Sequence, residues 1–179
     1  GKGLKRALVA PEGGADVLEI GRIKIADMYN LLSRRPAPLI TRDMVFGIPG
    51  RLDAGGEEIA LLDEKAVSDG ARRAIAAGAE GIVVSLLHSY RNPRHELRVK
   101  AIVEAEAPGL PVFCSSETWP IIREYERTIT TVIGAYVQPR VAHYLGSLQQ
   151  ALADILATTS QDAITENHRV HDLMVNGYR

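Results

Sequence analysis

A group of charged and hydroxyl side chains lies where an apolar segment gives way to a long helical pattern. The group consists of Arg123, Glu124, Glu126, Arg127, Thr128, Thr130 and Thr131. Arginine and hydroxyl donors at the start of a helix suit a bound phosphate or carboxylate. The same residue types also form helix caps and solvated, salt-bridged turns, and residue type alone favours that simpler interpretation.

Two further sets of polar residues follow apolar runs, and the ends of strands are where open α/β sheets place their ligands. Ser115, Ser116 and Glu117 come directly after one run, and His88 ends another. Glu117 and Glu124 could act as an acid/base pair, although their spacing is not diagnostic. His88 could be a general base or, as is more common, a hydrogen-bonded structural histidine.

The remaining histidines and the cysteine do not indicate a metal site or a reactive thiol. His168 and His171 are three residues apart and could share a helix face, but no third ligand type lies beside them. Cys114 is the only cysteine, which excludes an intrachain disulfide, and its place in an apolar run is typical of a small buried residue. The sequence also has neither common type of glycine-rich phosphate loop.

The composition is that of an ordinary globular protein. The chain has 179 residues, of which 46% are hydrophobic and 24% are charged, enough for one domain with a core. Its formal net charge of −1 does not point to nucleic acid or a membrane surface as a partner. No apolar run approaches the ~20 residues of a membrane span and no signal peptide is recognisable, so we expect a cytoplasmic protein or a piece of one.

An alternation of apolar runs and helical patterns must position the polar residues. Strands are predicted at Leu4–Ala10, Val83–Leu87 and Val112–Cys114, and the last two are expected to be central because they are apolar on both faces. Turn residues at Asp53–Gly56 predict a hairpin. This order predicts an α/β fold with a mixed, partly parallel sheet and flanking helices.

Four helices are predicted from apolar residues at three- and four-residue spacing. The first covers Ile25–Leu32, the second is capped by Asp63 and the third by Asn92. Their expected buried residues include Val67, Ala71, Ala74, Ile75, Leu97, Ile102 and Val103. The fourth, Ile129–Ile155, is the longest, and Pro139 is expected to kink or split it. Near the end of the chain, Val175–Tyr178 has the sequence of a hairpin turn.

Four stretches of the chain resemble the N-terminal region of the hydantoinase A/5-oxoprolinase family. That family includes ATP-dependent hydantoinases, 5-oxoprolinases and the ATP-using subunits of acetone and acetophenone carboxylases. The stretches are "ADVLEIGR", "GRLDAGGEEIALLDEKAV", "LLHSYRNPRHE" and "SSETWPIIREYERTITTVIGAYVQP". The resemblance runs from about Lys2 to Ile155, and the last stretch is its most specific part.

The resemblance implies a fragment of a larger actin/sugar-kinase-like ATPase subunit that works with a second catalytic subunit in a hetero-oligomer. Its members activate a cyclic amide (a hydantoin or 5-oxoproline) or a ketone by phosphoryl transfer from ATP. The Asp-Gly-Gly-Thr and Ser-Gly-Pro-Ala-Gly-Gly segments that such proteins use for the nucleotide do not occur in this sequence. ATP and Mg²⁺ are therefore expected to bind mainly to parts absent from this chain, which alone is expected to be inactive.

The resemblance also suggests a division of the chain. Residues 1–155 would form the N-terminal α/β region. Residues 156–179 resemble a stretch that such proteins carry well after Ile155, so we expect them to be a piece of a following region, with a possible break between Ile155 and Thr165.

Finally, the resemblance favours a functional interpretation of the polar groups. It does not itself assign roles. From the chemistry that it implies, we expect catalytic roles for Glu117, Glu124, Arg127 and Thr131. We expect substrate binding by His88, Ser115, Ser116, Arg123, Thr128 and Thr130. We expect this cluster to mark the rim of a ligand cleft, with Arg127 and Thr131 pointing inward. Two alternatives stay open: a non-catalytic assembly module that docks a partner subunit, and a free-standing small α/β enzyme that uses His88 and Glu117.

Overall fold

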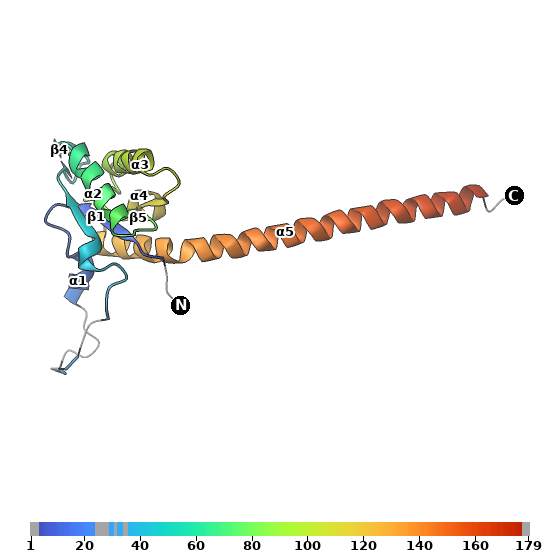
Figure 1. Cartoon of the computed structure of the whole chain (residues 1–179), viewed down its shortest axis with the longest axis horizontal. Helices are drawn as coiled ribbons and strands as arrows, with labels where there is room; N and C mark the ends of the chain where they lie inside the picture. Colours follow the sequence, from blue (N-terminus) through green and yellow to red (C-terminus); the bar gives the residue numbers. More distant parts are fainter. Residues whose placement is uncertain (1–3, 24–28, 31, 34–35, 177–179) are drawn as a thin grey trace. The chain divides into compact units, whose positions relative to one another are not determined.

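The computed structural model describes residues 4–23, 29–30, 32–33 and 36–176, with side chains described as far as residue 159. Contacts divide the chain into two units, residues 1–137 and 138–179. The first unit is an α/β domain and the second consists of the later part of one long helix (Figure 1). None of the helices in the described part of the chain has the length and apolar character of a membrane span.

The domain is built on a four-stranded sheet in which all neighbouring strands are parallel. Its strands are β1 (Ala7–Pro11), β2 (Val45–Ile48), β5 (Ile82–Val84) and β6 (Val112–Cys114), arranged in the order β2-β1-β5-β6. Val9 of β1 pairs with Phe46 on one side and Val84 on the other. The prediction of an α/β fold with parallel pairing is confirmed.

Helices and a hairpin connect the strands. Between β1 and β2 lie α1 (Val17–Ile20) and the short 3₁₀ helices η1 (Gly21–Ile23) and η2 (Arg42–Met44). Between β2 and β5 lie the antiparallel hairpin of β3 (Arg51–Leu52) and β4 (Glu58–Ala60), as predicted from its turn residues, and α2 (Glu64–Ala76). After β5 come α3 (Arg94–Glu106), β6, α4 (Ser115–Thr118) and α5 (Glu124–Asn176).

Local signals in the sequence account for the two helices beside the sheet. The Asp63 side chain accepts a hydrogen bond from the Ala66 amide and caps α2, as predicted. Gly78 follows the end of that helix with a φ of +84°, a conformation that favours glycine. Two bidentate ion pairs, Arg72 with Glu106 and Arg98 with Glu64, join α2 to α3.

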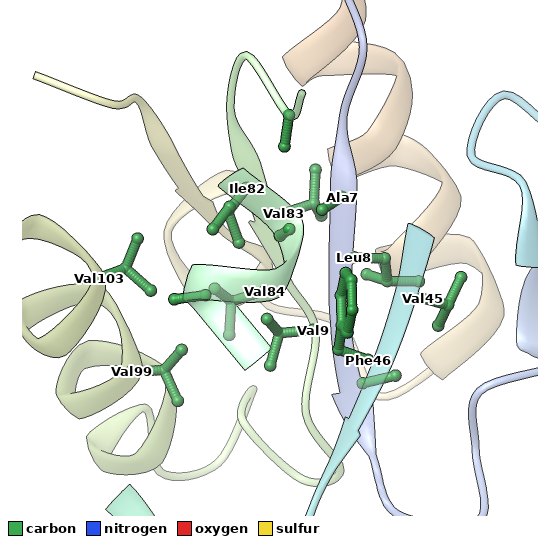
Figure 2. Close-up of a cluster of buried hydrophobic side chains, with 14 of the residues drawn as sticks. Ala7, Leu8, Val9, Val45, Phe46, Ile82, Val83, Val84, Val99 and Val103 are labelled. Atoms are coloured by element: carbon green, nitrogen blue, oxygen red, sulfur yellow. The ribbon is translucent and has the colours of Figure 1, made fainter. Parts of the chain in front are cut away.

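The core lies between the sheet and these helices. Leu8, Val9, Val83 and Val84 are almost fully buried, and Figure 2 shows Val99 and Val103 of α3 pointing towards β5. Val67, Ala71 and Ala74 of α2, Val103 of α3, and Val132 and Ala135 of α5 complete this cluster. Burying such aliphatic side chains stabilises a fold by about 1.5–3 kcal/mol each.

Several sequence predictions are corrected by the structure. Strand β5 ends at Val84 rather than Leu87, and β6 lies at the edge of the sheet, where Phe113 is only half-buried. Ile75 and Leu97 are exposed. Ile75 lies one residue beyond the apolar stripe of α2, and Leu97 lies two residues from Val99, which places it on the opposite side of α3.

Two predicted segments fall partly outside the described residues. Within the expected helix Ile25–Leu32, Tyr29 and Leu32 are exposed and non-helical, and residues 24–28 and 31 are not described. In the expected hairpin at the end of the chain, Val175 and Asn176 belong to α5 and the next residues are not described.

Helix α5 continues through Pro139 and shows no break in the backbone between Ile155 and Thr165. The expected split at the proline and the expected gap are therefore not observed. The division into residues 1–155 and 156–179 stays a prediction.

Candidate functional site

A cavity of about 220 Å³ lies beyond the carboxyl ends of β1 and β5. The chain passes from β1 to β2 on one side and later enters β5 on the other, so the strand order reverses between β1 and β5. Open α/β sheets bind their ligands in the crevice at such a switch point. We call this space the switch-point cavity. Its wall consists of Pro11, Glu12, Gly13, Gly14, Val17, Arg51, Ser85, Leu87, Glu124 and Thr128.

The loop after β1 forms one side of the switch-point cavity. The Gly14 amide donates to the Pro11 carbonyl, and the Glu12 amide donates to the Ile48 carbonyl of β2. Gly13 has a φ of +81°, which L-amino acids with a side chain rarely adopt. The turn therefore needs glycine at this position and brings the exposed Glu12 to the cavity mouth.

A chain of hydroxyl groups connects β5 to α5 at the cavity wall. Thr128 Oγ1 donates to the Glu124 carbonyl one turn earlier (2.8 Å), and Ser85 Oγ lies 2.6 Å from Thr128 Oγ1. A hydroxyl has a single proton. Because the Thr128 proton goes to Glu124, the proton of Ser85 must go to Thr128. Ser85 Oγ can then offer the cavity only an acceptor.

Glu124 places a half-buried carboxyl group in the same wall. Burial raises the pKa of Glu124 above its ordinary value, and the nearby positive charges of Arg127, His88 and Arg51 oppose this shift. A carboxyl group with a raised pKa holds its proton to higher pH and can donate a hydrogen bond, so Glu124 is suited to general acid–base work.

The β3–β4 hairpin brings Arg51 to the cavity and is fixed to the start of α3. Asn92 Nδ2 donates to the Gly56 carbonyl in the hairpin turn (2.8 Å). His95 Nε2 lies 2.5 Å from a carboxylate oxygen of Glu58 in β4. These contacts hold the hairpin, so an exposed guanidinium reaches the cavity from a well-anchored strand.

Behind this wall lies a buried polar network centred on Glu96 and Arg127. Glu96 Oε1 accepts from the Leu86 amide and from Ser115 Oγ, and Oε2 accepts from the Ser116 amide. Both Glu96 and Arg127 are fully buried. A buried carboxylate with three donors around it is held in one place, and so are the ends of β5 and β6 that supply these donors.

Each nitrogen of the Arg127 guanidinium donates a hydrogen bond inside the domain. Nε donates to Ser115 Oγ (2.9 Å), Nη1 to the Ile121 carbonyl (2.9 Å) and Nη2 to the Leu86 carbonyl (2.7 Å). Burial lowers the pKa of Arg127, and the charges of Glu96 and Glu124 oppose this shift. Arg127 thus ties the first turn of α5 to the segments after β5 and β6, and it is not part of the cavity wall.

The structure brings only part of the predicted site together. Glu124 and Thr128 line the switch-point cavity. Thr131 is buried and its Oγ1 donates to the Arg127 carbonyl, so neither Arg127 nor Thr131 points into that cavity. Ser115 belongs to the Glu96 network through its hydroxyl, and Ser116 through its amide. The catalytic and binding roles of these residues stay predictions.

The other predicted residues lie elsewhere on the domain. Glu117 is exposed and pairs with Lys100 (2.9 Å). Arg123 is exposed and its carbonyl accepts the Arg127 amide at the start of α5, while Thr130 is half-buried. His88 is half-buried beside Tyr90 and has a φ of +58°. Such a backbone conformation is uncommon outside glycine and often occurs near functional sites.

Sequence reasoning missed four residues that shape the site: Glu12, Arg51, Ser85 and Glu96. For Glu96 a signal was present, because positions 96, 99 and 103 share one face of a helix and two of them are valines. Ser85 lies within an apolar run, where a lone polar residue invites the question of its partner. No group of three or more acidic, histidine or cysteine side chains among the described residues could hold a metal ion.

Comparisons with known proteins show a match to a protein family and to several of its members. The family model described as "Hydantoinase/oxoprolinase N-terminal region" matches residues 1–107. The beta subunit of acetone carboxylase from Xanthobacter autotrophicus is 37% identical over 86% of this chain and 23% of its own length. The alpha subunit of caprolactamase from Pseudomonas jessenii is 34% identical over 80% of this chain and 21% of its own length.

The same similarity is found among solved structures. The nucleotide-free structure of acetone carboxylase superposes with a TM-score of 0.78 at 35% sequence identity, over 85% of this chain and 23% of that chain. The chain therefore spans less than a quarter of the length of these proteins. The predicted resemblance is confirmed.

Proposed function

Because this chain belongs to the hydantoinase/oxoprolinase family, whose N-terminal region it matches, we propose that it is the N-terminal α/β region of an ATP-dependent hydrolase or carboxylase subunit. In this proposal the switch-point cavity binds the carbonyl-bearing group that the enzyme activates. The similar proteins support a role in ATP-dependent chemistry, since they include an acetone carboxylase and a caprolactamase and are named as subunits.

The switch-point cavity does not fit the triphosphate of ATP. Its ionisable side chains are Glu12, Glu124 and Arg51, that is, two carboxyl groups and one guanidinium. A nucleotide triphosphate carries several negative charges and requires cations and amide donors around it. We therefore assign ATP and Mg²⁺ to another part of the full subunit and derive no step at this cavity from them.

The donors and acceptors in the wall favour an amide. Ser85 Oγ offers an acceptor because its own proton is committed to Thr128. Arg51 offers donors, and Glu124 offers one in its protonated form, which its raised pKa favours. A ligand with an N–H beside a carbonyl would use both sets, whereas a ketone has no N–H for Ser85. This hydrogen-bond chain is the observation that carries the proposal of a cyclic amide as the substrate.

Each residue then has a specific task. Ser85 orients the ligand through its N–H, and Arg51 and Glu124 polarise the carbonyl oxygen. Glu124 can also hold or release a proton at that oxygen as charge develops there. The buried Glu96–Arg127 network keeps Ser85 and the start of α5 in register, which is a positioning role.

The test compares two ring-matched ligands, the lactam pyrrolidinone and the ketone cyclopentanone. Calorimetric titration of the 179-residue chain should show the lactam binding at least about tenfold more tightly, since cyclopentanone leaves the Ser85 acceptor unpaired. Ser85→Ala should remove most of this preference. Ser116→Ala is the matched control, because Ser116 lies outside the cavity wall and its hydroxyl has no partner among the described residues.

Equal binding of the two ligands would contradict the amide assignment. An unchanged preference in Ser85→Ala would do the same, because the hydroxyl chain would then play no part in recognition.

A further inference from the structure

Helix α5 has an apolar stripe with no packing partner among the described residues. Every residue from 140 to 159 is exposed. The stripe consists of Val141, Tyr144, Leu145, Leu148, Leu152 and Ile155, whose exposed fractions lie between 44% and 65%. We call it the α5 stripe. Contiguous exposed apolar surface of this kind usually marks an interaction site.

The spacing of the α5 stripe is that of a helix seam. Its members recur at intervals of three and four residues and therefore lie along one side of the helix. Val141, Leu148 and Ile155 are seven residues apart, as at the core positions of a coiled coil. An isolated helix gains little stability in water on its own, so this side requires a covering surface.

The charges beside the α5 stripe indicate what covers it. Arg140, Ser147 and Asp154 each directly precede one of the seven-residue core positions and thus form one edge of the stripe. In two antiparallel helices the same edge of each helix faces its counterpart. Because Ser147 lies midway between Arg140 and Asp154, a twofold axis near Ser147 brings each arginine beside an aspartate of the other copy.

A parallel pair would not use these charges. In that arrangement the Arg140 edge faces the opposite edge of the partner helix, which consists of Leu145 and Leu152. Gln149 is the polar residue beside that edge and is uncharged. Charge complementarity therefore selects the antiparallel arrangement over the parallel one.

We propose that the α5 stripe binds a second copy of this chain, as an antiparallel pair of helices with its twofold axis near Ser147. Two Arg140–Asp154 pairs set the direction, and the apolar side chains supply the contact area. This inference does not depend on the proposed function, since it uses only residues 140–155 of α5.

The first test measures mass in solution. Sedimentation equilibrium of the 179-residue chain should show a dimer that dissociates on dilution. Leu148→Glu places a charge in the centre of the stripe and should give a monomer. Its far-UV circular dichroism spectrum should match that of the wild type, which would show that the fold is intact. Ala153→Glu adds the same charge on the side of the helix away from the stripe and should leave the dimer intact. A wild-type monomer at ~100 µM, a concentration within the usual range for specific association, overturns the proposal.

The second test reverses the charges. Arg140→Asp and Asp154→Arg should each weaken the dimer by about five- to tenfold, because like charges then meet in both pairs. The double variant Arg140→Asp/Asp154→Arg should restore wild-type association. Failure of the double variant to restore it overturns the antiparallel arrangement. Binding of the stripe to lipid vesicles without self-association would overturn the choice of a second copy.

Discussion

The guanidinium of Arg6 donates two hydrogen bonds to the carbonyl oxygen of Ala135, from Nε at 3.1 Å and from Nη2 at 2.9 Å. The amide that would normally close the helical bond to this carbonyl belongs to residue 139, which is proline and has no N–H. Arg6 is 3% exposed and also donates to the Glu80 carbonyl. A side chain at the start of β1 thus satisfies the acceptor that Pro139 leaves open in α5.

This relationship predicts a coupling between two distant positions in the sequence. Arg6→Met should lower the free energy of unfolding by about 1–3 kcal/mol, chiefly because the buried Ala135 carbonyl loses its partner. In a Pro139→Ala background the new amide can donate to the Ala135 carbonyl. Arg6→Met should then lower the free energy of unfolding by a smaller amount. Urea unfolding of the wild type, the two single variants and the double variant measures the coupling free energy between the two positions. If Arg6→Met lowers the free energy of unfolding equally in both backgrounds, Pro139 has no part in the role of Arg6.

A second prediction separates the two arginines at the start of α5. Arg127→Met should lower the free energy of unfolding by about 3–5 kcal/mol, because it leaves Glu96 as a buried charge without its counter-ion. Arg123→Met should change it by less than about 0.5 kcal/mol, since Arg123 is exposed. Thermal unfolding of both variants checks this, and a harmless Arg127→Met would show that the network is not structural.

The Arg127 prediction differs from what the sequence suggests. An arginine in a cluster of hydroxyl and charged residues has the composition of an exposed cleft rim, and removal of an exposed side chain leaves stability nearly unchanged. The sequence does not show that Glu96, thirty-one residues earlier, accepts hydrogen bonds from the same segments that Arg127 holds. Burial of a charged side chain depends on such long-range partners, and spacing along one element does not reveal them.

Elements with strong local signals were predicted well. Asp63 marks the cap of α2, and Asp53–Gly56 marks the hairpin, because capping and turn chemistry depend on neighbouring residues. The position of β6 at the sheet edge and the reversal of strand order beside β1 depend on pairing between distant strands. The switch-point cavity results from that order, so Ser85 and Arg51 could not be assigned to it from sequence.

A third prediction concerns pH. The folded state raises the pKa of Glu124 above its ordinary value of 4.5, so the folded chain holds this proton more tightly than the unfolded chain does. Between the two pKa values the folded state binds more protons, and the free energy of unfolding therefore falls as pH rises through this window. Glu124→Gln stays neutral at every pH and lacks this decline.

Thermal midpoints measured from about pH 4 to about pH 8 should show the wild type losing stability relative to Glu124→Gln as pH increases. The two proteins should respond alike below the unfolded pKa, where both side chains are neutral. A wild type that gains stability relative to the variant over this window would mean that Glu124 is stabilised as a carboxylate, and it could not then act as the donor proposed above.

The central claim is that the switch-point cavity binds an amide, and nuclear magnetic resonance mapping tests it most directly. Titration of the ¹⁵N-labelled 179-residue chain with pyrrolidinone should give saturable shifts at the amides of Gly13, Gly14 and Ser85, with no comparable shifts for cyclopentanone. Glu124→Gln should keep the location of these shifts, since a glutamine side chain can still donate. Saturable shifts confined to another surface, such as the Arg94 and Arg98 side of α3, or no shifts with the lactam at all, would contradict the account.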